Sequence, residues 1–149
     1  MKTVLSLIGA AALLTACAAP AATLTMYRDP GCGCCLAWAN RMEADGRHDV
    51  TSQDRPDMAA VKQRLGVPQN LWSCHTTIAD GFVIEGHVPR ADVERLLAER
   101  PAGVAGLAVA GMPLGSPGME AGGRIQPYQV IAFGPAGQSV WAEYPQDRL

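Results

Sequence analysis

Apolar residues recur along the chain with two different spacings, which predict where strands and helices lie. An alternating pattern over residues 24–28 and a weaker one over 48–52 indicate two short strands. The segment between them has an apolar face with helical spacing, made by Cys35, Trp38, Ala39 and Met42. We therefore expect a helix that follows the first strand, ends near Gly46 and places the Trp38 side chain in the core.

A second helix is predicted after the weak strand. Pro56 suits the first turn of a helix, where the missing backbone N–H costs nothing. An apolar stripe follows over residues 58–65, and Gly66 marks its end. We expect His48, at the start of the preceding strand, to be solvated rather than to bind a ligand.

A β-hairpin is predicted with strands at residues 74–79 and 82–86, because an Asp-Gly pair separates two runs of β-favouring residues. Pro89 then opens a third helix, and Pro101 ends it. Glu85 and His87, on or just after the hairpin, either are solvated, which we favour, or contact residues that bind a ligand.

Residues 102–123 are rich in Gly, Ala and Pro and predict a long loop. The apolar content of this segment argues against disorder, so we expect it to lie over the cysteine site described below. Two further β-favouring runs, at residues 128–133 and 139–144, predict a closing β-hairpin.

The order of these elements predicts an α/β protein. A βαβα run, a β-hairpin and a helix, with a C-x-x-C pair directly after the first strand, is the thioredoxin-like arrangement. We expect a βαβαββα core with an additional C-terminal β-hairpin and a long Gly/Pro/Met loop. The 149 residues suffice for one domain with its own core, which we place at residues 23–145.

Residues 1–22 predict an export signal and a short linker. Lys2 gives a positive start, and the apolar run at residues 4–14 is too short to span a membrane. The Leu-Thr-Ala-Cys sequence at residues 14–17 resembles the bacterial lipobox, in which the cysteine is lipidated; ordinary signal-peptidase cleavage is the alternative. In both cases we expect a periplasmic or cell-envelope protein, attached to a membrane only through a lipid anchor on Cys17.

The charge balance excludes one class of partner. Twelve Lys and Arg residues against fourteen Asp and Glu residues give a formal net charge of −2. A protein that binds nucleic acid needs a basic surface. We therefore expect no nucleic-acid partner.

Three of the five cysteines lie within four residues, at the predicted start of the first helix. Backbone N–H groups and the helix dipole stabilise thiolates there, and the thiolate is the form that attacks disulfides or binds metals. Cys32 and Cys35 are spaced as a C-x-x-C pair. Cys34 adds a third soft ligand that complicates a simple dithiol exchange, which favours a metal site over a redox motif.

Cys74 is the fourth candidate ligand, although it is remote in sequence. In a thioredoxin-like fold, the loop that leads into the third strand passes close to the dithiol, and the Ser-Cys-His-Thr sequence at residues 73–76 falls in this loop. We therefore expect the Cys74 sulfur to approach the cysteine cluster. Neighbouring strand residues point to opposite faces, so coordination by both Cys74 and His75 stays open.

The chain resembles the CopG-like family of periplasmic copper-resistance proteins, which was long catalogued as a domain of unknown function. The resemblance covers almost all of the chain after the leader. It rests on Asp-Pro-Gly-Cys-Gly-Cys-Cys at residues 29–35 with Trp38, Leu-Gly-Val-Pro at 65–68, Ser-Cys-His-Thr at 73–76, Val-Ile-Glu-Gly-His-Val-Pro at 83–89, Gly-Met-Pro at 111–113 and Gly-Ser-Pro-Gly-Met-Glu at 115–120.

The resemblance implies a copper protein with a cysteine-bridged, multinuclear centre and a role in interconverting Cu(I) and Cu(II). The family cysteines correspond to Cys32, Cys34, Cys35 and Cys74, and Met112 and Met119 correspond to family methionines that we treat as outer ligands. Soft sulfur ligands independently favour Cu(I), whereas zinc in a closed four-ligand site is the less favoured metal. Copper ions and other envelope copper-handling proteins are the expected partners.

A thiol–disulfide oxidoreductase is the alternative function. In this hypothesis Cys32 is the attacking thiolate and Cys35 is the resolving thiol. The fold and the C-x-x-C spacing favour it, whereas Cys34 and the Cys74-His75 pair argue against it. Whether the protein is an enzyme therefore stays open at this point.

Overall fold

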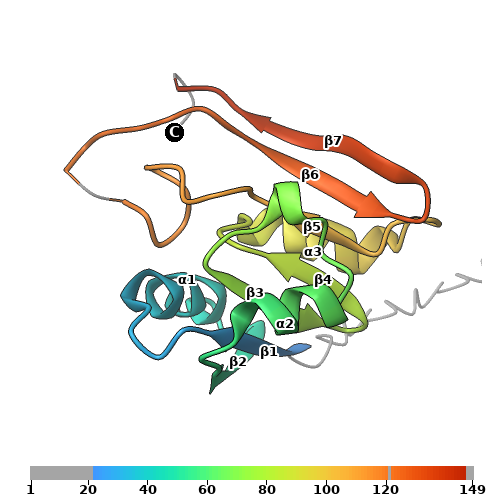
Figure 1. Cartoon of the computed structure of the whole chain (residues 1–149). Helices are drawn as coiled ribbons and strands as arrows, with labels where there is room; N and C mark the ends of the chain where they lie inside the picture. Colours follow the sequence, from blue (N-terminus) through green and yellow to red (C-terminus); the bar gives the residue numbers. More distant parts are fainter. Residues whose placement is uncertain (1–21, 121, 147–149) are drawn as a thin grey trace, which may run out of the picture.

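A computed structural model of the protein describes residues 22–120 and 122–146, and this part of the chain forms one mixed seven-stranded sheet with three α-helices (Figure 1). The predicted export signal, the lipobox and Cys17 lie outside the described residues. No helix in the described ranges is long and apolar enough to cross a membrane.

The elements follow one another in the predicted order, and the α/β class is confirmed. The strands are β1 (Ala22–Arg28), β2 (His48–Asp54), β3 (His75–Ala79), β4 (Phe82–Glu85), β5 (Gly106–Ala108), β6 (Tyr128–Gly134) and β7 (Gly137–Tyr144). The helices are α1 (Gly33–Glu43), α2 (Met58–Arg64) and α3 (Arg90–Glu99), with a short 3₁₀ turn at Gln69–Leu71. In the sheet, the strands lie in the order β2-β1-β3-β4-β5-β6-β7.

Strand β1 lies inside the sheet and positions the cysteine segment. It pairs in parallel with β2 and antiparallel with β3, and the last residue of β1, Arg28, is opposite the first residue of β3, His75. The segment that follows β1 and the segment that precedes β3 therefore meet at the same edge of the molecule. These two segments carry all four cysteines of the described chain.

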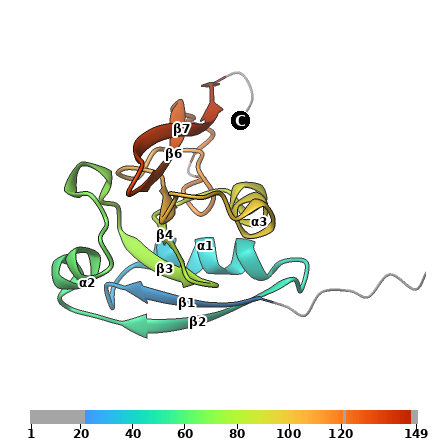
Figure 2. The same cartoon turned by 90° about the vertical axis from the view of Figure 1, so that its right-hand side faces the viewer.

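The helices cover both faces of the sheet. Trp38 on α1 and Leu96 on α3 are fully buried in one apolar cluster with Leu24 and Ile84 from the sheet. Val83, the neighbour of Ile84, belongs to a second cluster on the opposite face, because successive strand residues alternate between faces. Figure 2 shows α2 on one side of the sheet, with α1 and α3 on the other.

The prediction that His48 is solvated is wrong. The residue is 7% exposed, and its Nε2 lies 3.5 Å from Oε1 of Glu94. Glu94 belongs to α3, so its side chain reaches the start of β2 from a distant part of the chain. From the sequence alone His48 looks solvated, because no neighbouring residue indicates that the Glu94 side chain lies against it.

The predicted loop at residues 102–123 contains a strand, β5. Gly106 allows it, because a Cβ at this position would lie 1.9 Å from the carbonyl oxygen of Val83 in β4. β5 pairs in parallel with β4 and antiparallel with β6, and so attaches the closing β6–β7 hairpin to the rest of the sheet. The second difference is at α2, which begins at Met58 rather than Pro56 because the Asp57 side chain caps it by accepting from Ala60 N.

The remaining part of the predicted loop lies over the first turn of α1, as expected. Gly118 contacts the α1 backbone so closely that a Cβ would lie 2.7 Å from Trp38 N and 2.8 Å from Cys34 O. Its φ of +86° also favours glycine. An ion pair of 3.0 Å between Glu120 and Arg41 of α1 holds the end of the same segment.

Candidate metal centre

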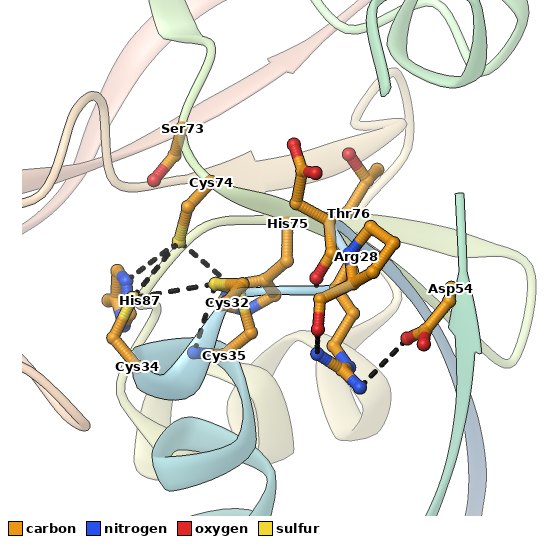
Figure 3. The surroundings of a disulfide bond; sticks show 12 residues. Arg28, Cys32, Cys34, Cys35, Asp54, Ser73, Cys74, His75, Thr76 and His87 are labelled. Atoms are coloured by element: carbon orange, nitrogen blue, oxygen red, sulfur yellow. Dashed lines mark hydrogen bonds and ion pairs between the residues drawn. A yellow bond between two sulfur atoms is a disulfide. The ribbon is translucent and has the colours of Figure 1, made fainter. Parts of the chain in front are cut away.

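Cys32 and Cys35 lie at the N-terminus of α1, where the structure joins them by a disulfide (Figure 3). Cys32 is the N-cap residue, and its sulfur accepts a hydrogen bond of 3.3 Å from Cys35 N. Cys35 is fully buried, whereas Cys32 is half-buried. The start of α1 therefore holds one fully buried and one half-buried cysteine of the pair.

Cys34 connects this pair to the second segment. Its sulfur lies 3.5 Å from the Cys32 sulfur and 3.9 Å from the Cys74 sulfur. All four sulfurs lie within 4.8 Å of one another. The structure thus brings the three clustered cysteines and the remote Cys74 into one group, as the sequence predicts.

Cys74 and His75 face the same site. The His75 ring is fully buried, and its Nδ1 lies 3.3 Å from the Cys74 sulfur. The alternation of side chains along a strand does not separate them, because β3 begins at His75 and Cys74 still belongs to the preceding segment.

The favoured expectation that His87 is solvated is wrong, and the structure favours the alternative in which it lies against the candidate ligands. The residue is fully buried, and its Nε2 lies 3.0 Å from the Cys74 sulfur. Its Nδ1 lies 2.8 Å from the carbonyl oxygen of Pro117, in the loop that covers the site. A glycine followed by a histidine directly after the β-hairpin was the available signal, because glycine allows the chain to turn. In the structure Gly86 has a φ of +70°, and the chain turns there toward the cysteines.

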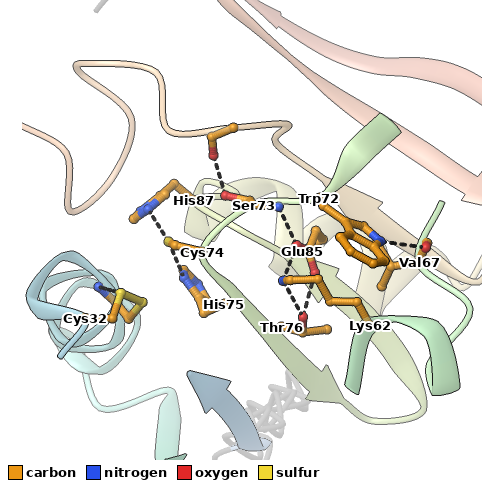
Figure 4. Close-up of polar contacts among 12 residues, drawn as sticks. Cys32, Lys62, Val67, Trp72, Ser73, Cys74, His75, Thr76, Glu85 and His87 are labelled. Atoms are coloured by element: carbon orange, nitrogen blue, oxygen red, sulfur yellow. Dashed lines mark hydrogen bonds and ion pairs between the residues drawn. A yellow bond between two sulfur atoms is a disulfide. The ribbon is translucent and has the colours of Figure 1, made fainter. Parts of the chain in front are cut away.

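The expectation that Glu85 is solvated is also wrong, because this carboxylate is completely buried beneath the site (Figure 4). Oε1 of Glu85 accepts from Lys62 Nζ at 2.5 Å and from Ser73 N at 2.6 Å, and Oε2 accepts from Thr76 Oγ1 at 2.6 Å. Ser73 and Thr76 flank Cys74 and His75 in the chain. One buried carboxylate therefore holds both ends of the segment that carries these two side chains.

The two methionines of the covering loop differ in exposure. Met112 is 53% exposed, and Met119 is half-buried. The carbonyl of Met119 accepts from Gly115 N at 3.0 Å, which closes the loop on itself. Their role as outer ligands stays a prediction.

Burial keeps the side chains around Cys74 neutral. It raises the pKa of the Cys74 thiol to about 12, with a smaller contribution from Cys34. Burial also lowers the pKa of the His75 and His87 imidazoles below their usual value. The histidines are thus in the neutral form that binds metals, whereas Cys74 must release a proton when a metal binds.

We predict that the metal-free protein loses stability in acid because of His75. The unfolded imidazole takes up a proton below a pH of about 6.5, and the buried one does not. The unfolding free energy should therefore be constant above this pH and fall below it, by up to about 1.4 kcal/mol per pH unit for one histidine. Urea unfolding between pH 8 and about 5 measures the slope. An unchanged slope in His75→Gln would contradict this assignment.

The fold and the site define an α/β protein with a cluster of cysteines and histidines, between two loops, that could hold a metal ion. The family model "Protein of unknown function, DUF411" matches residues 71–119. Two solved structures of "Copper resistance protein copG", forms 1 and 2, are each 48% identical to the chain with a TM-score of 0.78. The alignment covers 85% of this chain for form 1 and 84% for form 2, and 99% of each of those chains. The chain therefore belongs to the CopG-like family, which confirms the resemblance seen in its motifs. A comparison with curated proteins gives no match.

Proposed function

We propose that this protein binds copper in copper resistance and holds Cu(I) at Cys32, Cys34, Cys35 and Cys74. The observation that carries the proposal is the 3.9 Å approach of the Cys34 and Cys74 sulfurs from two segments forty residues apart. Soft thiolates select Cu(I), and because a thiolate can bridge two ions, four sulfurs can hold more than one. The name of the related solved structures supports copper over zinc as the metal.

The Cys32–Cys35 disulfide sets a condition for this activity. The two sulfurs are poor ligands while they are bonded to each other, so Cu(I) binding at all four requires prior two-electron reduction of the pair. The same pair supports a role in interconverting Cu(I) and Cu(II). We infer a location in the cell envelope, where the predicted leader and lipobox would deliver residues 23–145 as one domain to other copper-handling proteins.

An anaerobic Cu(I) titration of the reduced protein against a competing chelator tests the proposal. We expect chelator-resistant binding after reduction, and much weaker binding when the Cys32–Cys35 disulfide is intact. Absence of Cu(I) uptake by the reduced protein would overturn the proposed function. Equal uptake by both forms would show that these two sulfurs are not ligands.

The disulfide itself favours the second candidate function, a thiol–disulfide oxidoreductase. An insulin-reduction assay distinguishes the two functions. Turnover that Cys32→Ser abolishes and Cys74→Ser leaves unchanged would establish the oxidoreductase. We expect no such turnover, because the Cys34 sulfur, 3.5 Å from Cys32, competes for any mixed disulfide formed there.

A further inference from the structure

The half-buried sulfurs of the site are surrounded by uncharged segments of the chain. Residues 30–40, 66–74 and 109–119 meet there, because the Cys34 and Cys74 sulfurs lie 3.9 Å apart and the covering loop contacts the start of α1. None of the twelve Lys and Arg or fourteen Asp and Glu residues of the chain falls in these three segments. The absence of charge is therefore a property of this surface and not of the whole chain.

Charged residues flank two of these segments along the chain. Arg41 and Glu120 form an ion pair of 3.0 Å and so neutralise each other. Asp29 is exposed and leaves one negative charge directly before the first segment. A docking partner would meet an uncharged centre, with charge only toward the rim, as in ordinary protein interfaces.

An exposed apolar side chain lies beside each of the two cysteine-bearing segments. Leu36 is 43% exposed and follows Cys32 by one turn of α1, so the two side chains are neighbours on the helix surface. Met112 is 53% exposed and follows Gly111, whose carbonyl oxygen accepts from the Ser73 hydroxyl. The described residues contain just one other large exposed apolar side chain. Apolar groups gathered in this way are typical of a docking surface.

Two glycines on either side of Cys32 have no explanation within the chain. Gly31 and Gly33 do not have a positive φ, and a Cβ at either position would meet nothing within 4 Å. Every other glycine of the described ranges has a positive φ, or a Cβ position within 3 Å of another atom. Glycine at these two positions leaves Cys32 open to a close approach from outside the molecule.

The chemistry of the site indicates what approaches it. Cu(I) passes readily to thiolates from ligands that are soft but hold it less tightly, and a neutral thioether meets both conditions. In an oxidising compartment an exposed methionine also persists as a ligand where exposed thiols become disulfides. Methionine packs adaptably against apolar surface, which suits the exposed side chains described above.

We propose that Leu36, Met112 and the two glycines form a docking surface for an uncharged, methionine-rich segment of another protein that carries Cu(I). The direction of transfer rests on the proposed function, whereas the surface itself does not. In the transfer, Cu(I)–thioether bonds break while Cu(I)–thiolate bonds form, the thiol protons pass to water, and no electron is exchanged. Met112 contributes apolar surface to this contact.

Transfer from a capped Met-Gly-Met-Gly-Met peptide loaded with Cu(I) to the reduced, full-length protein tests the proposal. Stopped-flow absorption of the Cu(I)–thiolate bonds, without oxygen, measures the rate. Leu36→Asp and Met112→Asp should each slow transfer by about tenfold or more, whereas Met112→Leu should keep most of the rate because it stays apolar. Val140→Asp is the matched control, since Val140 is 52% exposed on β7, which four strands separate from β1.

Gly33→Ala is the sharpest variant, because alanine is the better residue inside a helix and should not destabilise α1. We expect it to slow transfer from the peptide by about threefold or more. Cu(I) supplied in acetonitrile needs no docking surface, so Gly33→Ala and Leu36→Asp should load from it like the parent. Circular dichroism of each variant distinguishes lost docking from lost folding.

Equal transfer rates for Leu36→Asp, Met112→Asp and Val140→Asp would overturn the docking surface, and uptake from acetonitrile would then leave the proposed function standing. An equal loss in Met112→Leu and Met112→Asp would remove Met112 from the surface. A dimer in sedimentation that Leu36→Asp dissociates would replace the proposed partner by a second copy of the chain. Fluorescence anisotropy of a labelled, copper-free peptide measures docking without transfer. If binding of that peptide depends on Leu36 while the protein takes up no Cu(I) from either source, the proposed function fails and the surface stands.

Discussion

Cys74→Ser should lose Cu(I) ions that the unaltered protein retains against a chelator. The Cys74 sulfur is the one donor of the four-sulfur group that comes from the segment before β3, and it lies 3.9 Å from Cys34. A hydroxyl is a poor Cu(I) ligand, so the remaining sulfurs lose a closing or bridging partner. We expect fewer ions per chain and retention that is weaker by about tenfold or more, which corresponds to about 1.4 kcal/mol. Anaerobic titration of the reduced variant measures both quantities.

A matched variant separates this effect from a general loss of stability. Thr77 lies in β3, three residues after Cys74, and its buried hydroxyl has no hydrogen-bond partner. Thr77→Val should therefore leave copper binding unchanged. If Cys74 is only a packed residue, Cys74→Ser costs on the order of 1 to 3 kcal/mol of stability and keeps the full copper content. That result would remove Cys74 from the metal centre.

Glu85→Gln should be the most destabilising of these variants, by about 3 to 5 kcal/mol. The carboxylate is fully buried and lies 2.5 Å from the Lys62 ammonium, which has an exposed fraction of only 4% in its side chain. A neutral amide leaves that ammonium without its counter-charge in the protein interior. Because Glu85 also accepts from Ser73 N and from the Thr76 hydroxyl, Cu(I) retention should weaken as well. Urea unfolding and the Cu(I) titration measure the two effects.

An exposed ion pair in the same protein provides the control. Asp80 pairs with Arg100 at the surface, where both side chains are more than half exposed. Asp80→Asn should cost no more than about 1 kcal/mol, and asparagine tolerates the positive φ of 46° at this turn. The double variant Lys62→Met with Glu85→Leu should recover part of the lost stability, since it removes both buried charges. Equal losses for Glu85→Gln and Asp80→Asn would contradict the buried-pair interpretation.

Elements with local signals were predictable from the sequence. The Asp80-Gly81 pair specifies its hairpin directly, because both residues adopt the positive φ that this turn requires. The approach of Cys74 to the cluster was predictable for a different reason, namely that the order of elements places the two segments at one edge of the sheet. In both cases the information lies in one short segment or in the order of strands and helices.

Features that depend on several distant segments were not predictable in this way. β5 has three residues and forms only because β4 and β6 lie on either side of it. His87 becomes a site residue because the loop at Pro117 folds over it. Glu85 is polar and looks solvated in the sequence, yet Lys62 from α2 compensates its burial. Each of these outcomes requires knowledge of packing that no single segment contains.

The separation of the cysteines along the chain also determines the order in time in which the metal centre can form. Cys32 and Cys35 are three residues apart, so their disulfide can form in a chain that has no other structure. Cys34 and Cys74 are forty residues apart and meet only after β1 has paired with β3. The disulfide can therefore form before β1 and β3 pair, whereas the four-sulfur group exists only after they have paired. A variant that slows the pairing of these strands should delay assembly of the four-sulfur group without slowing formation of the Cys32–Cys35 disulfide.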